Sequence, residues 1–226
     1  VKYFYMIGIK IVLDILERNN ILKINRYSSL SSGCVSIVMM ACNVNNTILI
    51  KKYKKYIILD KISKLPKLKL LQLFLAETLP DNAHLLCNNR VFITATELDY
   101  IPKKVIFSKY KSKKDLINKI MCSVSFPYFI NKDYYYNLNN KKYIDGCFMI
   151  NTPYFNNNTN QIIIKPFFVN KINLFSIESF SDISSIFDGF NDMKSHLLGN
   201  HILPIQWYNK KNIYQKLFEY IKYFIL

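Results

Sequence analysis

The feature that most constrains the fold is a helix that is apolar nearly all round and follows directly after a short strand. Residues 32–42 predict this helix, because small and apolar side chains occupy almost every position. A helix without a polar face must be buried. The strand candidate covers residues 26–29, so the chain passes from strand to helix within one short turn. With 226 residues, 50% of them hydrophobic, the chain is long enough to build the core that such a helix needs.

Strand and helix patterns alternate along the chain. Short runs rich in β-branched residues predict strands over 91–96, 104–107, 142–144, 162–165 and 172–176. Periodic apolar positions predict helices over 6–18, 65–79, 113–122, 182–198 and 212–224. Residues 47–62 are ambiguous, and their lysine run is typical of a solvated helix face. This alternation predicts an α/β fold with a mostly parallel central sheet covered by helices on both faces. No repeat or linker divides the chain, so we expect a single domain over residues 1–226.

The strong positive charge narrows the classes of partner. The chain has 31 Lys and Arg residues against 15 Asp and Glu residues, a net charge of +16, which favours an anionic partner. Only three of the basic residues are Arg, the side chain that reads phosphates and bases best. Ile, Asn, Lys and Tyr all have AT-rich codons and are abundant together. Genome composition therefore explains part of the excess of lysine over acidic residues. We therefore expect no nucleic-acid partner. A basic nucleic-acid-binding protein stays as an alternative, which a salt-dependent binding slope would test.

The cysteines and apolar runs bear on the compartment. Five scattered cysteines show neither CxxC nor metal-finger spacing, which predicts free thiols in a reducing compartment and no metal or cofactor site. The first residues lack the pattern of a secretory signal. No apolar run reaches the roughly 18 residues that span a bilayer. We expect a cytoplasmic protein.

The turn between strand and helix carries the first candidate site. Ser31 stands at its centre, with Ser29 two residues before it and Gly33 two residues after it. This is the pattern of a nucleophile elbow, in which small flanking residues let strand and helix pass closely while the serine is exposed on a strained turn. The helix N-terminus that follows can stabilise an oxyanion through its free N–H groups. A serine-rich loop with a helix cap is the alternative interpretation.

A second candidate lies more than a hundred residues further along. Asp145 and Gly146 follow the strand predicted over 142–144, and the sequence Asn-Thr-Pro comes shortly after them at 151–153. A carboxylate at the carboxyl end of a strand lies at the sheet edge where α/β proteins keep their sites. An ordinary Asp-Gly turn is the alternative interpretation.

Together the two segments resemble the patatin-like phospholipase family, which carries G-x-S-x-G on an elbow and D-G-G/A, usually followed by N-x-P. The matching residues are Ser29-Leu30-Ser31-Ser32-Gly33 and Asp145-Gly146-Cys147. Further segments, at 7–13, 79–84, 91–96, 113–117 and 122–127, run in order and are similar to the branch that contains adipose triglyceride lipase and adiponutrin. The resemblance is clearest over residues 3–155, whereas residues 160–226 are not distinctive. The AT-rich composition suggests a divergent member from a large DNA virus or a protist.

The resemblance implies a three-layer patatin-like fold and a Ser–Asp dyad that needs no histidine. Ser31 would be the nucleophile and Asp145 the general base, without a metal or cofactor. The expected reaction is hydrolysis of fatty-acyl esters of phospholipids or acylglycerols through an acyl-enzyme intermediate. His84, His196 and His201 lie outside both motifs, and we expect them to be packing or surface residues.

Some positions depart from the family pattern. The family's oxyanion loop, G-G-G-x-K/R-G, would end at Val1, Lys2 and Tyr3, with Tyr3 where glycine is usual. Either the chain is an N-terminally truncated member whose leading glycines lie upstream of residue 1, or the loop is absent. The oxyanion hole would then be mostly upstream, with contributions from Val1, Lys2 and the Ser32 backbone. Cys147, like the serine at position 29, replaces a glycine or another small residue of the family motif. These departures leave a catalytically degenerate member, which binds lipid or a protein partner, as the alternative.

A lipid hydrolase must also meet an interface. Residues 212–226 place apolar side chains near one face, with Lys211, Lys216 and Lys222 available to anionic headgroups. An ordinary C-terminal helix packed on the core is the favoured interpretation of this segment. We expect peripheral association with a membrane or lipid-droplet surface, assisted by the basic charge. The choice between phospholipid and triacylglycerol stays open.

Overall fold

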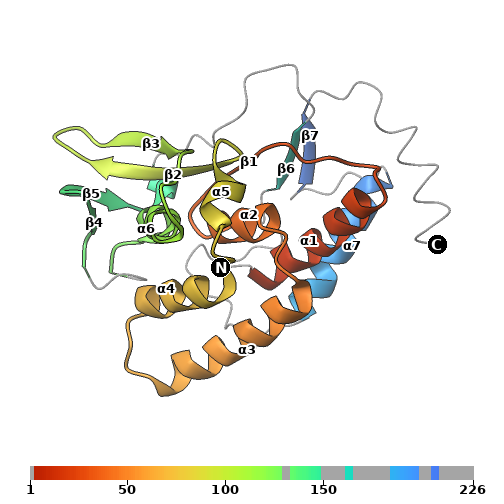
Figure 1. Cartoon of the computed structure of the whole chain (residues 1–226), viewed down its shortest axis with the longest axis horizontal. Coiled ribbons are helices and arrows are strands. Elements are labelled where there is room, and N and C mark those ends of the chain that lie inside the picture. Colours follow the sequence, from red (N-terminus) through yellow and green to blue (C-terminus); the bar gives the residue numbers. More distant parts are fainter. Residues whose placement is uncertain (1–2, 129–132, 149–160, 165–183, 199–204, 209–226) are drawn as a thin grey trace. The chain divides into compact units, whose positions relative to one another are not determined.

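The computed structural model describes residues 3–128, 133–148, 161–164, 184–198 and 205–208 (Figure 1). The chain divides into two compact units. One unit covers Asn25–Tyr154 and holds both candidate motifs, and the other joins Val1–Ile24 to Phe155–Leu226. The expectation of a single domain over residues 1–226 stays a prediction.

A five-stranded mixed sheet is the framework of the Asn25–Tyr154 unit (Figure 1). Strand β2 (Val91–Leu98) pairs in parallel with β1 (Tyr27–Leu30) and antiparallel with β3 (Lys103–Phe107) and β5 (Lys141–Ile144). Strand β4 (Tyr136–Leu138) pairs antiparallel with β5. The α/β class is therefore as expected. The expectation of a mostly parallel sheet is wrong for the described strands of this sheet, because β1 and β2 form its single parallel pair.

Two of the three antiparallel pairs in this sheet, β2–β3 and β4–β5, are formed by strands that short connections join. Residues 99–102 join β2 to β3, and Asn139 and Asn140 join β4 to β5. Both asparagines have positive φ, of 50° and 60°. Two consecutive left-handed residues are typical of a type I′ turn, whose twist matches a hairpin, and Asn tolerates that conformation. This hairpin and strand β4 were not predicted from the sequence.

Helix α2 (Gly33–Ala41) is buried at every position after its first residue, as its lack of a polar face predicts. It packs on β1 and β2, while α6 (Lys113–Val124) packs on β2, β4 and β5. A buried cluster of Ala95, Cys122 and Tyr143 joins α6 to the sheet. Helix α6 was correctly predicted from its apolar face, which extends to Val124.

Strand β2 is buried on both of its faces. Ile93 and Ala95 lie on one face and Thr94 and Thr96 on the other, and all four are at most 1% exposed. Burial on both faces is typical of a strand inside an α/β layer arrangement. β2 is also the central strand of this sheet, since β1, β3 and β5 all pair with it.

Three further helices belong to the same unit. Helix α3 (Asn46–Ile62) resolves the ambiguous segment, and α4 (Lys67–Thr78) occupies the predicted 65–79 region. The Asn45 side chain caps α3, since its Oδ1 accepts hydrogen bonds from the backbone N–H groups of the second and third helical residues. The short helix α5 (Ala83–Cys87) was not predicted from the sequence.

The other unit contains two helices and two strands among its described residues. Helix α1 (Tyr3–Arg18) packs against α7 (Ser184–Leu197), and Tyr5 Oη donates a hydrogen bond to Asp192 Oδ2 at 2.9 Å. Strands β6 (Gln161–Ile164) and β7 (Ile205–Tyr208) pair antiparallel. The helices predicted over 6–18 and 182–198 and the strand predicted over 162–165 are confirmed, whereas β7 was missed. The elements predicted at 172–176 and 212–224 lie outside the described residues.

Among the described residues, the helices are all too short or too polar to cross a membrane.

Candidate active site

Two strands end opposite each other on one edge of β2, and this convergence builds the candidate site. Along that edge, Leu30 at the end of β1 pairs with Thr94, and Ile144 at the end of β5 pairs with Thr96. β1 runs parallel to β2 and β5 runs antiparallel to it, so their carboxyl ends face each other across the position of Ala95. The residues that follow the two strands therefore lie next to each other.

These two following residues are Ser31 and Asp145, and they are in direct contact. Ser31 Oγ donates a hydrogen bond to Asp145 Oδ2 over 2.7 Å, although 114 residues separate them in the sequence. The contact brings the two sequence-predicted catalytic candidates together. It requires both pairings of β2, because each strand alone fixes only one of the partners.

Ser31 occupies a strained turn between β1 and α2. Its φ of 53° lies in the left-handed region, which non-glycine residues adopt at a cost of order 1–3 kcal/mol. Ser29 and Gly33 face each other across this turn, because a Cβ atom built on Gly33 would lie 2.2 Å from Ser29 Oγ. The small residues flanking the central serine thus meet the close-approach requirement that the elbow pattern predicts.

Asp145 is almost completely buried, at 1% exposure, and is held on several sides. Its Oδ1 accepts a hydrogen bond from the Cys147 N–H at 2.9 Å, its backbone N–H donates to the Ser125 carbonyl, and its carbonyl accepts from Thr96 Oγ1 at 3.0 Å. Burial raises the pKa of this carboxyl above its ordinary value, and the hydrogen bonds from Cys147 and Ser31 only partly offset that effect. The result is a positioned carboxylate that is a stronger base than an exposed one.

Gly146, the residue after Asp145, packs closely against the backbone of β2. A Cβ atom at this position would approach the backbone carbonyl oxygen of Thr94 to 2.3 Å and the Leu30 Cβ to 3.1 Å. The loop after β5 therefore passes so close to β2 that only glycine fits. This is the physical reason for the Asp-Gly pair in the sequence.

Ser123, on α6, completes the site and had been given no role from the sequence. Its Oγ accepts a hydrogen bond from the Ser31 N–H at 2.9 Å and donates one to the Thr94 carbonyl at 2.6 Å. The hydroxyl also lies 3.2 Å from Cys34 Sγ. The available signal was a serine on the otherwise apolar buried face of an amphipathic helix, a position where a hydroxyl needs a specific partner.

Two backbone donors at the start of α2 lie next to the serine. The first N–H groups that bond back into the turn are those of Cys34 and Val35, to the carbonyls of Ser31 and Ser32 at 3.0 and 3.2 Å. Ser32, the N-cap residue, makes no side-chain capping hydrogen bond. The N–H groups of Ser32 and Gly33 therefore have no acceptor within the described part of the chain, and the helix dipole adds partial positive charge beside them.

The histidines lie apart from the dyad contacts. His84 is half-buried on α5, and His196 is 3% exposed on α7, in the other unit. Neither is a hydrogen-bond partner of Ser31 or Asp145. His201, the oxyanion candidates Val1 and Lys2, and residues 151–153 all lie outside the described residues.

All five cysteines are free thiols, and Cys147 alone among them is exposed. No group of His, Cys, Asp or Glu side chains suited to hold a metal ion occurs among the residues that the structure describes. Comparison of the chain with protein-family models, with curated proteins and with solved structures found no match.

Proposed function

We propose that this chain is a serine acyl hydrolase in which Ser31 is the nucleophile and Asp145 the general base. The observation that carries the proposal is the 2.7 Å hydrogen bond from Ser31 Oγ to the buried Asp145 carboxylate, at the end of a strand-to-helix turn. An activated serine needs a base within hydrogen-bond reach and a rigid support for both groups. The hydrogen bonds of Ser31 with Ser123 and of Asp145 with Cys147 supply the rigid support.

The proposed reaction has two halves. Ser31 Oγ attacks the ester carbonyl carbon while Asp145 takes the hydroxyl proton, and a tetrahedral oxyanion forms. The oxyanion collapses, the carbon–oxygen bond to the alcohol breaks, and Asp145 returns the proton to the leaving alcohol. In the second half, water attacks the acyl-enzyme as Asp145 takes a proton from it, and a second tetrahedral oxyanion forms. Its collapse breaks the bond from the acyl carbon to Ser31 Oγ, Asp145 returns the proton to that oxygen, and the fatty acid is released. The raised pKa of Asp145 suits both the taking and the giving of the proton.

The oxyanion would receive hydrogen bonds from the Ser32 and Gly33 N–H groups at the start of α2. Val1 and Lys2 remain further candidates for this role. A three-layer patatin-like arrangement is part of the proposal, and it is supported by the burial of β2 on both faces and by the parallel β1–β2 pair leading into α2. The class of substrate, fatty-acyl esters of phospholipids or acylglycerols, follows from the family resemblance. A cytoplasmic lipid surface is where we expect the reaction, on the cysteine pattern and the composition of the first residues.

A second candidate is a catalytically degenerate relative that binds lipid or a protein partner. The observation in its favour is the Ser29 side chain, which fills the space beside Gly33 where the family pattern has glycine. A turn that is crowded at this point can hold its backbone donors away from the oxyanion position, and the loss of one such donor costs about 10²–10³ in rate.

Fluorophosphonate labelling of the whole chain, followed by peptide mapping, tests the proposal. We expect an adduct on Ser31 that is lost in Ser31→Ala and strongly reduced in Asp145→Asn. His84→Ala should label like the wild type. The matched control is Ser28→Ala, since Ser28 is a serine of β1, the strand that leads into the turn of Ser31. An adduct that persists in Asp145→Asn would refute the dyad. A folded wild-type chain without an adduct would favour the degenerate relative.

A further inference from the structure

The tip of the β2–β3 hairpin presents two adjacent apolar side chains to solvent. Tyr100 is fully exposed and Ile101 is 75% exposed, and both belong to the 99–102 connection, which we term the hairpin tip. Single exposed apolar residues are common on protein surfaces. Because Tyr100 and Ile101 are neighbours at the end of a hairpin, both can contact the same surface at once.

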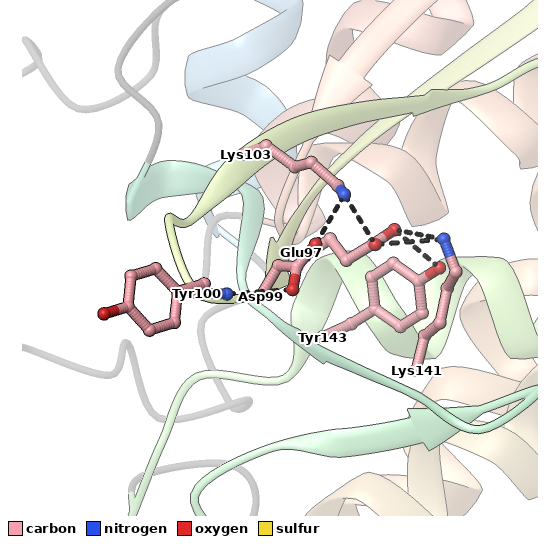
Figure 2. Close-up of polar contacts among 6 residues, drawn as sticks. All are labelled: Glu97, Asp99, Tyr100, Lys103, Lys141 and Tyr143. Carbon is pink, nitrogen blue, oxygen red and sulfur yellow. Dashed lines mark hydrogen bonds and ion pairs between the residues drawn. The ribbon is translucent and has the colours of Figure 1, made fainter.

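A network of charged side chains holds the base of the hairpin tip (Figure 2). Glu97, which is 5% exposed, receives hydrogen bonds from Lys141 Nζ at 3.0 and 3.2 Å and from Tyr143 Oη at 3.2 Å. Lys103 bridges Glu97 at 3.2 Å and Asp99 at 2.8 Å across the hairpin. The base of the tip is thus cross-linked between strands β2, β3 and β5.

Asp99 extends the same network to the tip itself. Its Oδ1 accepts a hydrogen bond from the Tyr100 N–H at 2.9 Å, which fixes the backbone at the start of the turn. In Figure 2 the Tyr100 ring points away from the charged cluster. Because the backbone is already ordered, exposing these two side chains does not require a flexible loop, and insertion into another phase would cost little conformational entropy.

Lysines surround the base of the tip. Lys103 and Lys104 begin β3, and Lys141 and Lys142 begin β5. These four positive charges exceed the two negative charges of Glu97 and Asp99. Lys142 pairs with Leu98, the last residue of β2, so both lysine pairs lie at the tip end of the sheet. Two exposed apolar side chains with excess positive charge next to them complement an anionic lipid surface. Apolar side chains enter the acyl boundary of such a surface, and lysines contact its headgroups.

The tip also lies in a defined direction from the dyad. The dyad sits beside Ala95, and β2 continues from there to Leu98 and into the tip. At about 3.3 Å per residue, the tip extends roughly 15 Å beyond the dyad along the strand. Anchoring at the tip would hold this end of the sheet close to the surface that carries the substrate.

We propose that the hairpin tip is a docking element for anionic lipid surfaces, with Tyr100 and Ile101 entering the interface and the surrounding lysines contacting the headgroups. Only the view that docking delivers ester to Ser31 rests on the proposed function. Docking itself requires no catalysis, so the two proposals can fail separately.

Co-sedimentation with vesicles of phosphatidylcholine alone and of phosphatidylcholine with 30% phosphatidylserine tests the docking. The double variant Tyr100→Ser/Ile101→Ser should bind the anionic vesicles at least about tenfold more weakly, because it removes the two large apolar side chains that would enter the interface. The matched control is Ile58→Ser/Ile62→Ser on the lysine-rich helix α3, where the two side chains are 58% and 73% exposed. This control should change binding less than twofold. Circular dichroism and Tm should confirm that both variants are folded.

Lys104→Gln/Lys142→Gln should weaken binding to the anionic vesicles and leave binding to neutral ones unchanged. Equal binding by the tip variant and the wild type would overturn the proposal, as would an equal loss in the α3 control or a wild type that binds neither vesicle. Ser31→Ala should bind vesicles like the wild type. If hydrolysis occurs, the tip variant should cleave a soluble short-chain ester normally and vesicle substrate slowly. Tip-dependent binding without any hydrolysis would retain the docking and refute only the proposed activity.

Discussion

Ser123 holds the backbone of Ser31 through a side-chain hydroxyl that lies 92 residues further along the chain. The same hydroxyl donates to the Thr94 carbonyl, so it ties the strained serine to the central strand through one oxygen atom. A left-handed serine persists only when its surroundings fix it. Ser123 is therefore a positioning residue, which acts on the reaction through Ser31.

We expect Ser123→Ala to lower the free energy of unfolding by about 1–3 kcal/mol, because it leaves the Ser31 N–H without its partner in a buried site. It should also lower kcat with little change in KM, since no substrate contact is lost. Chemical denaturation and ester hydrolysis measure the two effects. Ser28→Ala is the matched control, because the Ser28 hydroxyl is buried, with no hydrogen-bond partner among the described residues, and its removal should be neutral or stabilising. Equal effects of the two substitutions would contradict a positioning role.

The raised pKa of Asp145 predicts that the wild type and Asp145→Asn diverge in stability as pH rises. The ionised carboxylate is disfavoured by burial, so the stability linked to this group is present below its ordinary pKa and is lost as pH rises through the folded pKa. At neutral pH, Asp145→Asn should therefore be at least as stable as the wild type while lacking activity. Urea unfolding of both proteins from pH 4 to 8 gives the difference. A difference that does not vary with pH would show that the carboxyl is not perturbed.

The same group should set the acid limb of the activity profile. Hydrolysis requires the Asp145 carboxylate to be ionised, so kcat/KM should fall as pH drops through its raised pKa. The fall should begin at a higher pH than for an exposed aspartate, whose pKa is about 3.9. A soluble ester at constant ionic strength is a suitable substrate. An acid limb at the ordinary aspartate value would indicate a solvated base.

The two glycines of the site predict different costs of substitution. Gly146→Ala should destabilise the fold by about 1–3 kcal/mol or more, because the new Cβ would meet the fixed backbone of β2. Gly33→Ala should cost less, because its Cβ would meet only the Ser29 hydroxyl, which can rotate away. In a Ser29→Gly background the cost of Gly33→Ala should disappear. A double-mutant cycle with no coupling between positions 29 and 33 would contradict the observed contact.

The elements around the site were largely predictable from the sequence, because each has a strong local pattern. The apolar run of α2, the alternation of β2 and the amphipathic face of α6 each decide their element without help from the rest of the chain. Ser31 and Asp145 were chosen from motifs, and the structure places them in contact. The roles assigned to them stay predictions that the labelling experiment tests.

The sheet topology could not be predicted in the same way. A short strand such as Lys141–Ile144 carries no information on whether it runs parallel or antiparallel to its neighbour. That choice is made by the Asn139-Asn140 turn, whose left-handed backbone reverses the chain and pairs β4 with β5. Ser123 was missed for a related reason: its partners lie in the turn after β1 and in β2, and no local pattern connects α6 with these segments.

The meeting of β1 and β5 on one edge of β2 has a consequence for how the protein is made. Helix α2 and its elbow can form early from nearby residues, but the carboxylate arrives only when the chain has been made through β5 and that strand has paired. Contacts between such distant segments close later than local ones. A growing chain therefore carries the serine without its base while the 114 residues that separate the two positions are being made. The proposed hydrolase would stay inert until the last strand of its sheet is in place.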